Sequence, residues 1–104
     1  MQGYEVIFLS NAQQDLDDIV SYITQELMKP DSAARLLDVI NKRGKSLAYL
    51  PRRFPLVNDA RLAKKAYRMM PVENYHLFYR IHEKKKLVSI VRIVYNRRDW
   101  ARLL

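Results

Sequence analysis

The sequence predicts an α+β domain with the element order βααβββ, in which an N-terminal helical hairpin packs on one face of an antiparallel sheet. Three observations lead to this fold class. A short run of β-forming residues opens the chain, two stretches with apolar residues at helical spacing follow, and three runs rich in aromatic and β-branched residues come last. We find no linker or low-complexity stretch in the sequence, so we expect residues 1–104 to form one domain.

Residues 4–9 are rich in β-formers and predict the first strand. Ser10 is expected to cap the helix that follows, because Gln13 three residues later completes a capping-box pattern. Aspartates at positions 15, 17 and 18 lie early in this helix, where the helix dipole favours negative charge. The helix is expected to reach about Met28, because an apolar stripe runs along one face: Ala12, Leu16, Ile19, Ile23 and Leu27.

A second helix is predicted after the break at residues 29–32. Its buried stripe consists of Ala33, Leu36, Leu37, Ile40, Gly44, Leu47 and Ala48. We expect Gly44 to let the two helices approach closely, because glycine has no side chain to keep them apart. The short connection makes the two helices an antiparallel hairpin, and residues 51–58 are expected to form a loop.

Residues 66–72, 75–82 and 87–95 are predicted to be three strands of an antiparallel meander, followed by a helical turn within residues 98–104. Strand alternation assigns their side chains to two faces. If Glu83 lies opposite Leu87, Phe78 faces Arg92, and the even-numbered side chains share one face. The helices are expected to cover the odd-numbered, apolar face. The other face then stays open and carries His76, Phe78, Arg80 and Arg92, joined by Arg68 and Met70 if the turn at residues 72–74 keeps the same parity.

Composition and charge narrow the functional classes. Hydrophobic residues make up 49% of the chain and cysteine is absent, which excludes a disulfide scaffold and a thiolate metal site. No apolar run approaches the roughly 20 residues that span a bilayer, so we expect a cytoplasmic protein without membrane contact. Residues 1–40 contain two basic and seven acidic residues, whereas residues 41–104 contain seventeen basic and four acidic ones. An anionic partner is therefore expected on the second part, unless these charges only solvate the surface.

Basic side chains interleaved with aromatic ones favour nucleic-acid binding, because arginine binds phosphate and aromatic rings stack on unpaired bases. These residues are Arg61, Lys64, Lys65, Arg68, His76, Arg80, Arg92, Tyr95, Arg97 and Arg98. Metal-ligand and glycine-rich phosphate-binding motifs are absent, so we expect no metal and no cofactor. The remaining catalytic hypothesis is metal-free RNA cleavage, with proton transfer and phosphorane stabilisation by Arg68, His76, Tyr95 and Arg97. The alternative is that His76 is a structural residue of the strand.

A set of short motifs, each weak alone, keeps one order along nearly the whole chain. They include Ala12-x-x-Asp15-Leu16-x-x-Ile19-x-x-Tyr22-Ile23, Leu50-Pro51-x-x-x-Pro55, Tyr67-Arg68, Tyr75-x-x-x-Tyr79-Arg80-Ile81 and Val91-Arg92-Ile93-x-Tyr95-x-x-Arg98-Asp99. In this order and spacing the sequence resembles the RelE/ParE toxin superfamily of bacterial type II toxin–antitoxin modules. The βααβββ order of that family agrees with the fold predicted from the residues.

The resemblance implies two mechanisms, because RelE-like members cut mRNA on the ribosome and ParE-like members poison DNA gyrase. Arg68 and Arg97 match basic positions of the RelE branch, whereas Met70 and His76 stand where further basic residues would be expected. No tyrosine follows Arg97, so the RelE set is incomplete. The aspartate-rich first helix looks more like the ParE branch.

The sequence therefore favours a growth-arresting toxin that inhibits DNA gyrase and forms a hetero-oligomer with a cognate antitoxin. A ribosome-dependent mRNA interferase is the alternative, with His76 and Tyr95 as acid and base. A non-toxic module that binds RNA or protein is the second alternative. If the target is bound through charge, the contact residues are expected to be Arg61, Lys64, Lys65, Arg80, Arg92 and Arg98.

Overall fold

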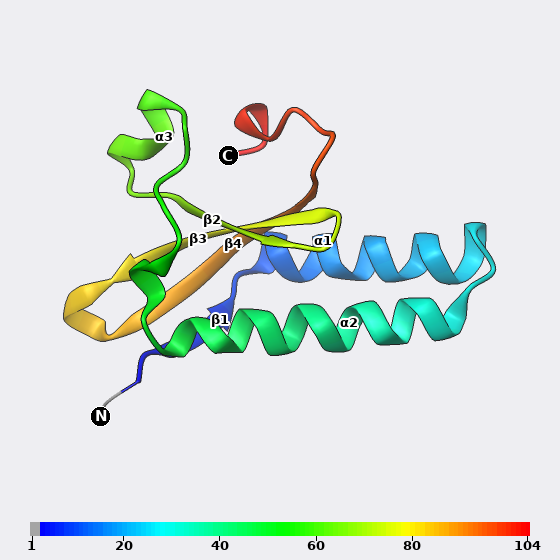
Figure 1. Cartoon of the computed structure of the whole chain (residues 1–104). Coiled ribbons are helices and arrows are strands. Elements are labelled where there is room, and N and C mark those ends of the chain that lie inside the picture. The colour runs from blue at the N-terminus through cyan, green and yellow to red at the C-terminus, as the bar shows by residue number, and fades with distance from the viewer. Residues whose placement is uncertain (1–2) are drawn as a thin grey trace.

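The computed structural model describes residues 3–104 and has the predicted order of helices and strands, with one additional short helix before the second strand (Figure 1). Its main elements are β1 (Glu5–Phe8), α1 (Ser10–Ser21), a π-helical turn (Tyr22–Glu26), α2 (Pro30–Lys45), α3 (Ala60–Lys64), β2 (Arg68–Val72), β3 (Tyr75–His82) and β4 (Leu87–Tyr95). The predicted α+β fold is confirmed. Of the helices in this range, none is long and apolar enough to cross a membrane.

The sheet has the strand order β1-β4-β3-β2. The meander β2-β3-β4 is antiparallel, as expected. In contrast, β1 joins the sheet parallel to β4, with Glu5 opposite Leu87 and Phe8 opposite Ile90. Helices α1 and α2 carry the chain away and back before the meander starts, so β1 and β4 run in the same direction (Figure 1). The sheet is therefore mixed rather than wholly antiparallel.

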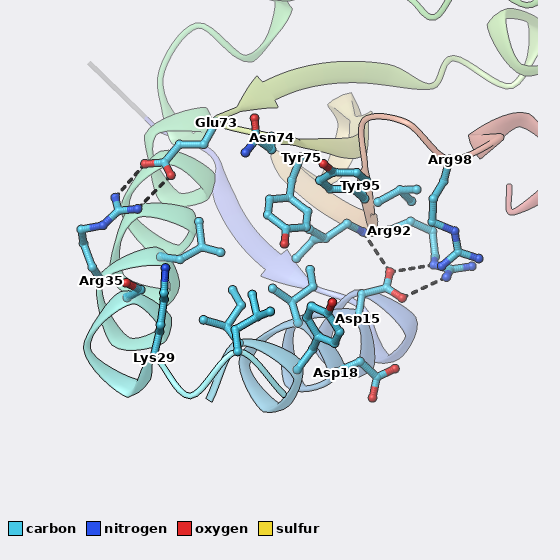
Figure 2. Close-up of a pocket in the computed structure, with 18 of the residues that line it drawn as sticks. Asp15, Asp18, Lys29, Arg35, Glu73, Asn74, Tyr75, Arg92, Tyr95 and Arg98 are labelled. Carbon is cyan, nitrogen blue, oxygen red and sulfur yellow. Dashed lines mark hydrogen bonds and ion pairs between the residues drawn. The ribbon is translucent and has the colours of Figure 1, made fainter. Parts of the chain in front are cut away.

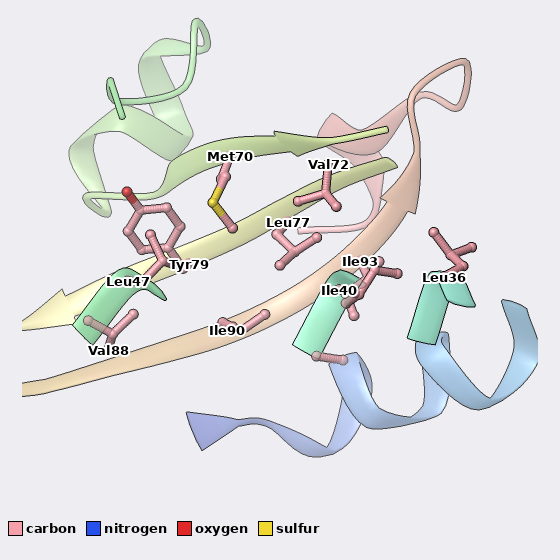
Figure 3. Packing of buried hydrophobic residues seen from close by; sticks show 11 residues of the cluster. Leu36, Ile40, Leu47, Met70, Val72, Leu77, Tyr79, Val88, Ile90 and Ile93 are labelled. Carbon is pink, nitrogen blue, oxygen red and sulfur yellow. The ribbon is translucent and has the colours of Figure 1, made fainter. Parts of the chain in front are cut away.

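The helical hairpin covers one face of the sheet and forms the main core with it (Figure 3). Ile40 of α2 and Leu47, just after it, are fully buried among residues of β2, β3 and β4. Gly44 lies in the same contact, but its neighbours belong to the sheet and not to α1. A Cβ atom there would lie 2.8 Å from Cζ of Phe8 and 3.0 Å from Cδ1 of Ile90. The expectation that Gly44 brings the helices together is wrong, because the glycine faces β1 and β4.

Helix α1 begins without the predicted capping box. Leu9 is the N-cap residue, and the Gln13 side-chain amide donates to the Phe8 carbonyl oxygen at 2.8 Å. Asp15 consequently lies in the second turn, beyond the strongest part of the helix dipole. The π-helical turn ends at Glu26, and Met28 then adopts a left-handed conformation (φ 56°) that reverses the chain toward α2.

The pairing of the strands changes two predicted side-chain positions. Val72 and Tyr75 pair with each other across a turn of two residues. Even-numbered residues of β2 therefore share a face with odd-numbered residues of β3. Met70 is therefore fully buried beneath the helices, and Arg68 also lies on the helical face. Their placement on the opposite face required the turn to keep the same parity, and the observed pairing changes the parity, so that placement is wrong.

The β3–β4 pairing keeps Phe78 opposite Arg92 as predicted, by a different route. His82, rather than Glu83, lies opposite Leu87. A β-bulge next to Phe78 then inserts one extra residue of β4 and restores the predicted pairing beyond it.

The second face of the sheet is covered and not open. Phe78 and Val94 are buried there together with Leu62 of α3, a helix that the sequence analysis missed. The Trp100 ring packs on Phe78 with 5.1 Å between centroids. Helix α3 and the C-terminal segment thus form a second core, and the predicted open basic face is wrong.

Candidate functional site

A groove of about 850 Å³ lies between the outer part of the helical hairpin and the end of the sheet (Figure 2). It forms because β1 pairs with β4 only as far as Ile90, which leaves the last residues of β4 without a neighbouring strand on that side. Its apolar lining comes from α1, the π-helical turn and the residue after it, α2 and the strands: Ile19, Tyr22, Ile23, Leu27, Leu36, Tyr75 and Tyr95. Tyr22 is 56% and Leu27 47% exposed, so the groove offers apolar surface to a partner.

Asp15 closes one end of this groove by binding the unpaired edge of β4 (Figure 2). Its carboxylate accepts from Nε and Nη2 of Arg92 at 2.7 and 2.9 Å, and from the Ile93 backbone N–H at 2.9 Å. The hydrogen bond to Asp15 raises the pKa of Arg92. Because Arg92 also donates to the Leu103 carbonyl oxygen at 3.1 Å, this ion pair joins α1, β4 and the C-terminal segment.

Arg35 and Glu73 form a second ion pair at the other end of the groove (Figure 2). Arg35 Nη1 and Nη2 donate to the two carboxylate oxygens of Glu73 at 2.8 and 3.1 Å, which lowers the pKa of Glu73. The pair connects α2 to the turn between β2 and β3. Between the two ion pairs, Tyr75 and Tyr95 pack edge to face, with ring centroids 5.7 Å apart. The site is therefore an aromatic and apolar groove with an ion pair at each end, and Asp18, Lys29 and Arg98 add further charged groups to its lining.

The four residues expected for RNA cleavage do not come together. Arg68 donates to the Phe54 carbonyl oxygen at 2.7 Å, at the opposite end of β2–β3 from Tyr95. His76 lies on the other face of the sheet beside Phe78, where burial lowers its pKa. Its Nδ1 atom is buried without a hydrogen-bond partner among residues 3–104. Arg97 lies exposed in the turn after β4.

The residues expected to bind nucleic acid or a target are spread over several surfaces. Arg61 on α3 donates to the Ala101 carbonyl oxygen at 2.9 Å, and the Arg80 guanidinium lies 5.4 Å from the centre of the Tyr67 ring. Arg92 is bound to Asp15 as described above, and Arg98 lines the groove. Lys64 and Lys65 remain exposed at the end of α3.

Sequence reasoning missed the groove, although it found the stripe that forms one wall. The stripe Leu16–Ile19–Ile23–Leu27 continues beyond the part of α1 that packs on the sheet, and Leu27 at its end is exposed. An apolar stripe longer than the strands available to cover it was the signal for a partner-binding surface.

Comparison with protein families and comparison with solved structures agree with each other. A family profile described as the ParE toxin of the type II toxin–antitoxin system parDE matches residues 6–100. The chromosomal ParDE system from P. aeruginosa contains a similar chain, with a TM-score of 0.74, 19% identity and coverage of 88% of this chain and 95% of that one. A chain of the RelBE2 toxin–antitoxin complex from Mycobacterium tuberculosis has a TM-score of 0.66 and 21% identity, and covers 89% of this chain and 98% of its own. Curated protein sequences give no match.

Proposed function

The chain belongs to the ParE toxin family of type II toxin–antitoxin systems, and on this premise we propose that it arrests growth by inhibiting DNA gyrase and is neutralised by a protein antitoxin. The family match spans residues 6–100, which include all the helices and nearly all of the sheet. Two target classes compete, namely gyrase and ribosome-bound mRNA. The placement of the predicted catalytic residues supports the first.

Metal-free RNA cleavage needs its acid, its base and a cation within hydrogen-bond reach of one phosphodiester. Arg68 and Tyr95 lie opposite Tyr79 and Tyr75, which are four residues apart on β3 and so about 13 Å from each other. His76 lies on the opposite face of the same strand. This separation supports action by binding a target protein rather than by cutting RNA.

The groove suits an antitoxin segment that folds as it binds. Its two ion pairs are satisfied within the chain, so a partner would gain affinity mainly by burying apolar side chains against Tyr22, Leu27 and Tyr95. An amphipathic helix placed in an apolar groove presents such side chains at regular spacing. An antitoxin bound there would form the toxin–antitoxin hetero-oligomer that we propose as the resting state.

Tightly controlled expression, combined with an assay on purified gyrase, tests the proposal. We expect filamentous growth arrest with intact transcripts, and inhibition of DNA supercoiling by the purified protein. The Arg97→Ala variant serves as a control and should arrest growth like the wild type, because the gyrase proposal gives Arg97 no role and its exposed position makes the fold tolerant of the change. Ribosome-dependent mRNA cleavage that Arg97→Ala abolishes would overturn the gyrase proposal in favour of an mRNA interferase. Normal growth with soluble protein present would overturn the toxin activity itself.

A further inference from the structure

A second exposed apolar surface lies far from the groove and consists of Tyr49 and Leu50, which we call the Tyr49–Leu50 knob. The two side chains are 59% and 73% exposed. The knob follows the C-terminal end of α2, whereas the groove is lined by residues near the N-terminal end of this helix. Helix α2 has 16 residues and so separates the two surfaces by about 24 Å (Figure 1).

The backbone of the knob is held in an unusual conformation by surrounding groups. Leu50 is left-handed (φ 51°, ψ 55°), a conformation that L-residues with large side chains rarely adopt. Nη1 of Arg53 donates to the carbonyl oxygens of Tyr49 (2.7 Å) and Ser46 (3.2 Å). Pro51 follows Leu50, and its carbonyl oxygen accepts a hydrogen bond from the hydroxyl of buried Tyr79. These contacts fix the loop, yet the Leu50 side chain projects outward and is not buried.

The surroundings of the knob are strongly basic. Residues 42–53 and 83–86 contain eight lysines and arginines and one acidic residue, Glu83. Two further acidic residues adjoin them, because Asp38 pairs with Lys42 at 3.0 Å and the Glu5 backbone N–H donates to the Lys86 carbonyl oxygen, so the excess of basic residues is eight to three. Glu83 binds Arg52 at 2.6 Å, which places the turn between β3 and β4 beside the loop of the knob. The Tyr4 hydroxyl and Lys86 also donate to Glu83, so its charge is already neutralised. A partner complementary to this end of the molecule would therefore carry carboxylates around an apolar site.

We propose that the Tyr49–Leu50 knob is the contact surface for the folded cellular target of the toxin, and that Leu50 enters an apolar pocket rimmed by carboxylates on that protein. This inference rests on the proposed function. A rigid projecting side chain loses little conformational freedom when it enters a preformed pocket, and a folded protein supplies such a pocket. An antitoxin segment that folds as it binds fits the groove at the other end of α2, so the two surfaces have different occupants.

The Leu50→Asn variant tests this contact, because asparagine tolerates the left-handed conformation and leaves the fold intact. We expect its melting temperature to equal or exceed that of the wild type. Growth arrest, and gyrase inhibition by purified protein, should need at least about tenfold more toxin. Met28→Asn is the matched control, because Met28 is also left-handed (φ 56°) and 78% exposed but lies at the far end of the hairpin. This control should keep wild-type potency.

A further variant tests the acidic rim of the pocket, and capture by the antitoxin tests whether the antitoxin binds the knob. Leu50→Asp should lose more potency than Leu50→Asn, because its carboxylate would face an acidic rim. Both variants should still be captured by a cognate antitoxin that captures the wild type. A folded Leu50→Asn protein with full potency would overturn the proposal. An equal loss of potency in the Met28→Asn control would also overturn it. Loss of antitoxin capture by the Leu50 variants would overturn it too, and would assign the knob to the antitoxin instead. If the wild type arrests growth without inhibiting gyrase, the proposed target fails, and the growth assay still decides the role of the knob.

Discussion

Replacement of Asp15 by alanine should destabilise the fold far more than any other single change to the acidic face of α1. The change leaves the Arg92 guanidinium, whose side chain is only 20% exposed, without its carboxylate. It also removes the acceptor of the Ile93 N–H group. Removing one partner of a buried ion pair typically costs 3–5 kcal/mol. Because both side chains keep some solvent contact, we expect about 3 kcal/mol for Asp15→Ala, and about half of this for Asp15→Asn, which keeps an oxygen for Ile93.

Urea unfolding followed by circular dichroism measures this loss. For a chain of this size, about 3 kcal/mol corresponds to a fall of roughly 1–3 M in the midpoint. The exposed residue Asp17 on the same helix gives the control Asp17→Ala, which should change the free energy of unfolding by less than about 0.5 kcal/mol. A loss below about 1 kcal/mol for Asp15→Ala would refute the reasoning, because the ion pair would then behave like a surface contact.

Three further predictions follow from the same structure. Gly44→Ala should lower the free energy of unfolding by about 1 kcal/mol despite the better helix propensity of alanine, because the new Cβ atom meets the Phe8 ring; a urea titration that shows a gain would contradict this. Burial lowers the pKa of His76, so the unfolded state binds its proton more readily and stability should fall as the pH drops below about 6.5. His76→Gln should flatten this pH dependence in thermal melts, and unchanged slopes would remove His76 as its source. Tyr22→Ser should weaken antitoxin binding about tenfold in calorimetry without lowering the melting temperature, whereas Tyr49→Ser, with similar exposure, should bind normally.

The sequence predicted the order of helices and strands well, because hydrophobic spacing and β-forming runs are local signals. It failed where the outcome depended on a single residue of register. The two-residue turn after Val72 and the bulge in β4 decide which face each side chain takes. The alternation of apolar and polar residues along the strands does not predict the register of the turn or the position of the bulge. Helix α3 has five residues, too few for a periodic pattern, although Asp59 caps it by accepting from the Leu62 N–H.

The candidate site was harder to predict because its contacts join distant parts of the chain. Asp15 and Arg92 are 77 positions apart, and only the folded chain shows that they neutralise each other. The charge asymmetry between the two parts of the sequence was real, but it indicated binding surfaces only in part. Several of those charges, Arg92 and Arg35 among them, are paired within the domain instead.

The parallel pairing of β1 with β4 has a consequence for synthesis of the protein. Glu5 precedes both helices, β2 and β3 along the chain, whereas its partner Leu87 is made only after all of them. Contacts between residues so far apart in sequence form late, since the chain between them must first be ordered. We therefore expect the nascent chain to form its helical hairpin early and to complete the sheet only when β4 emerges. A prematurely terminated product that lacks β4 would then be inactive and a ready substrate for proteases.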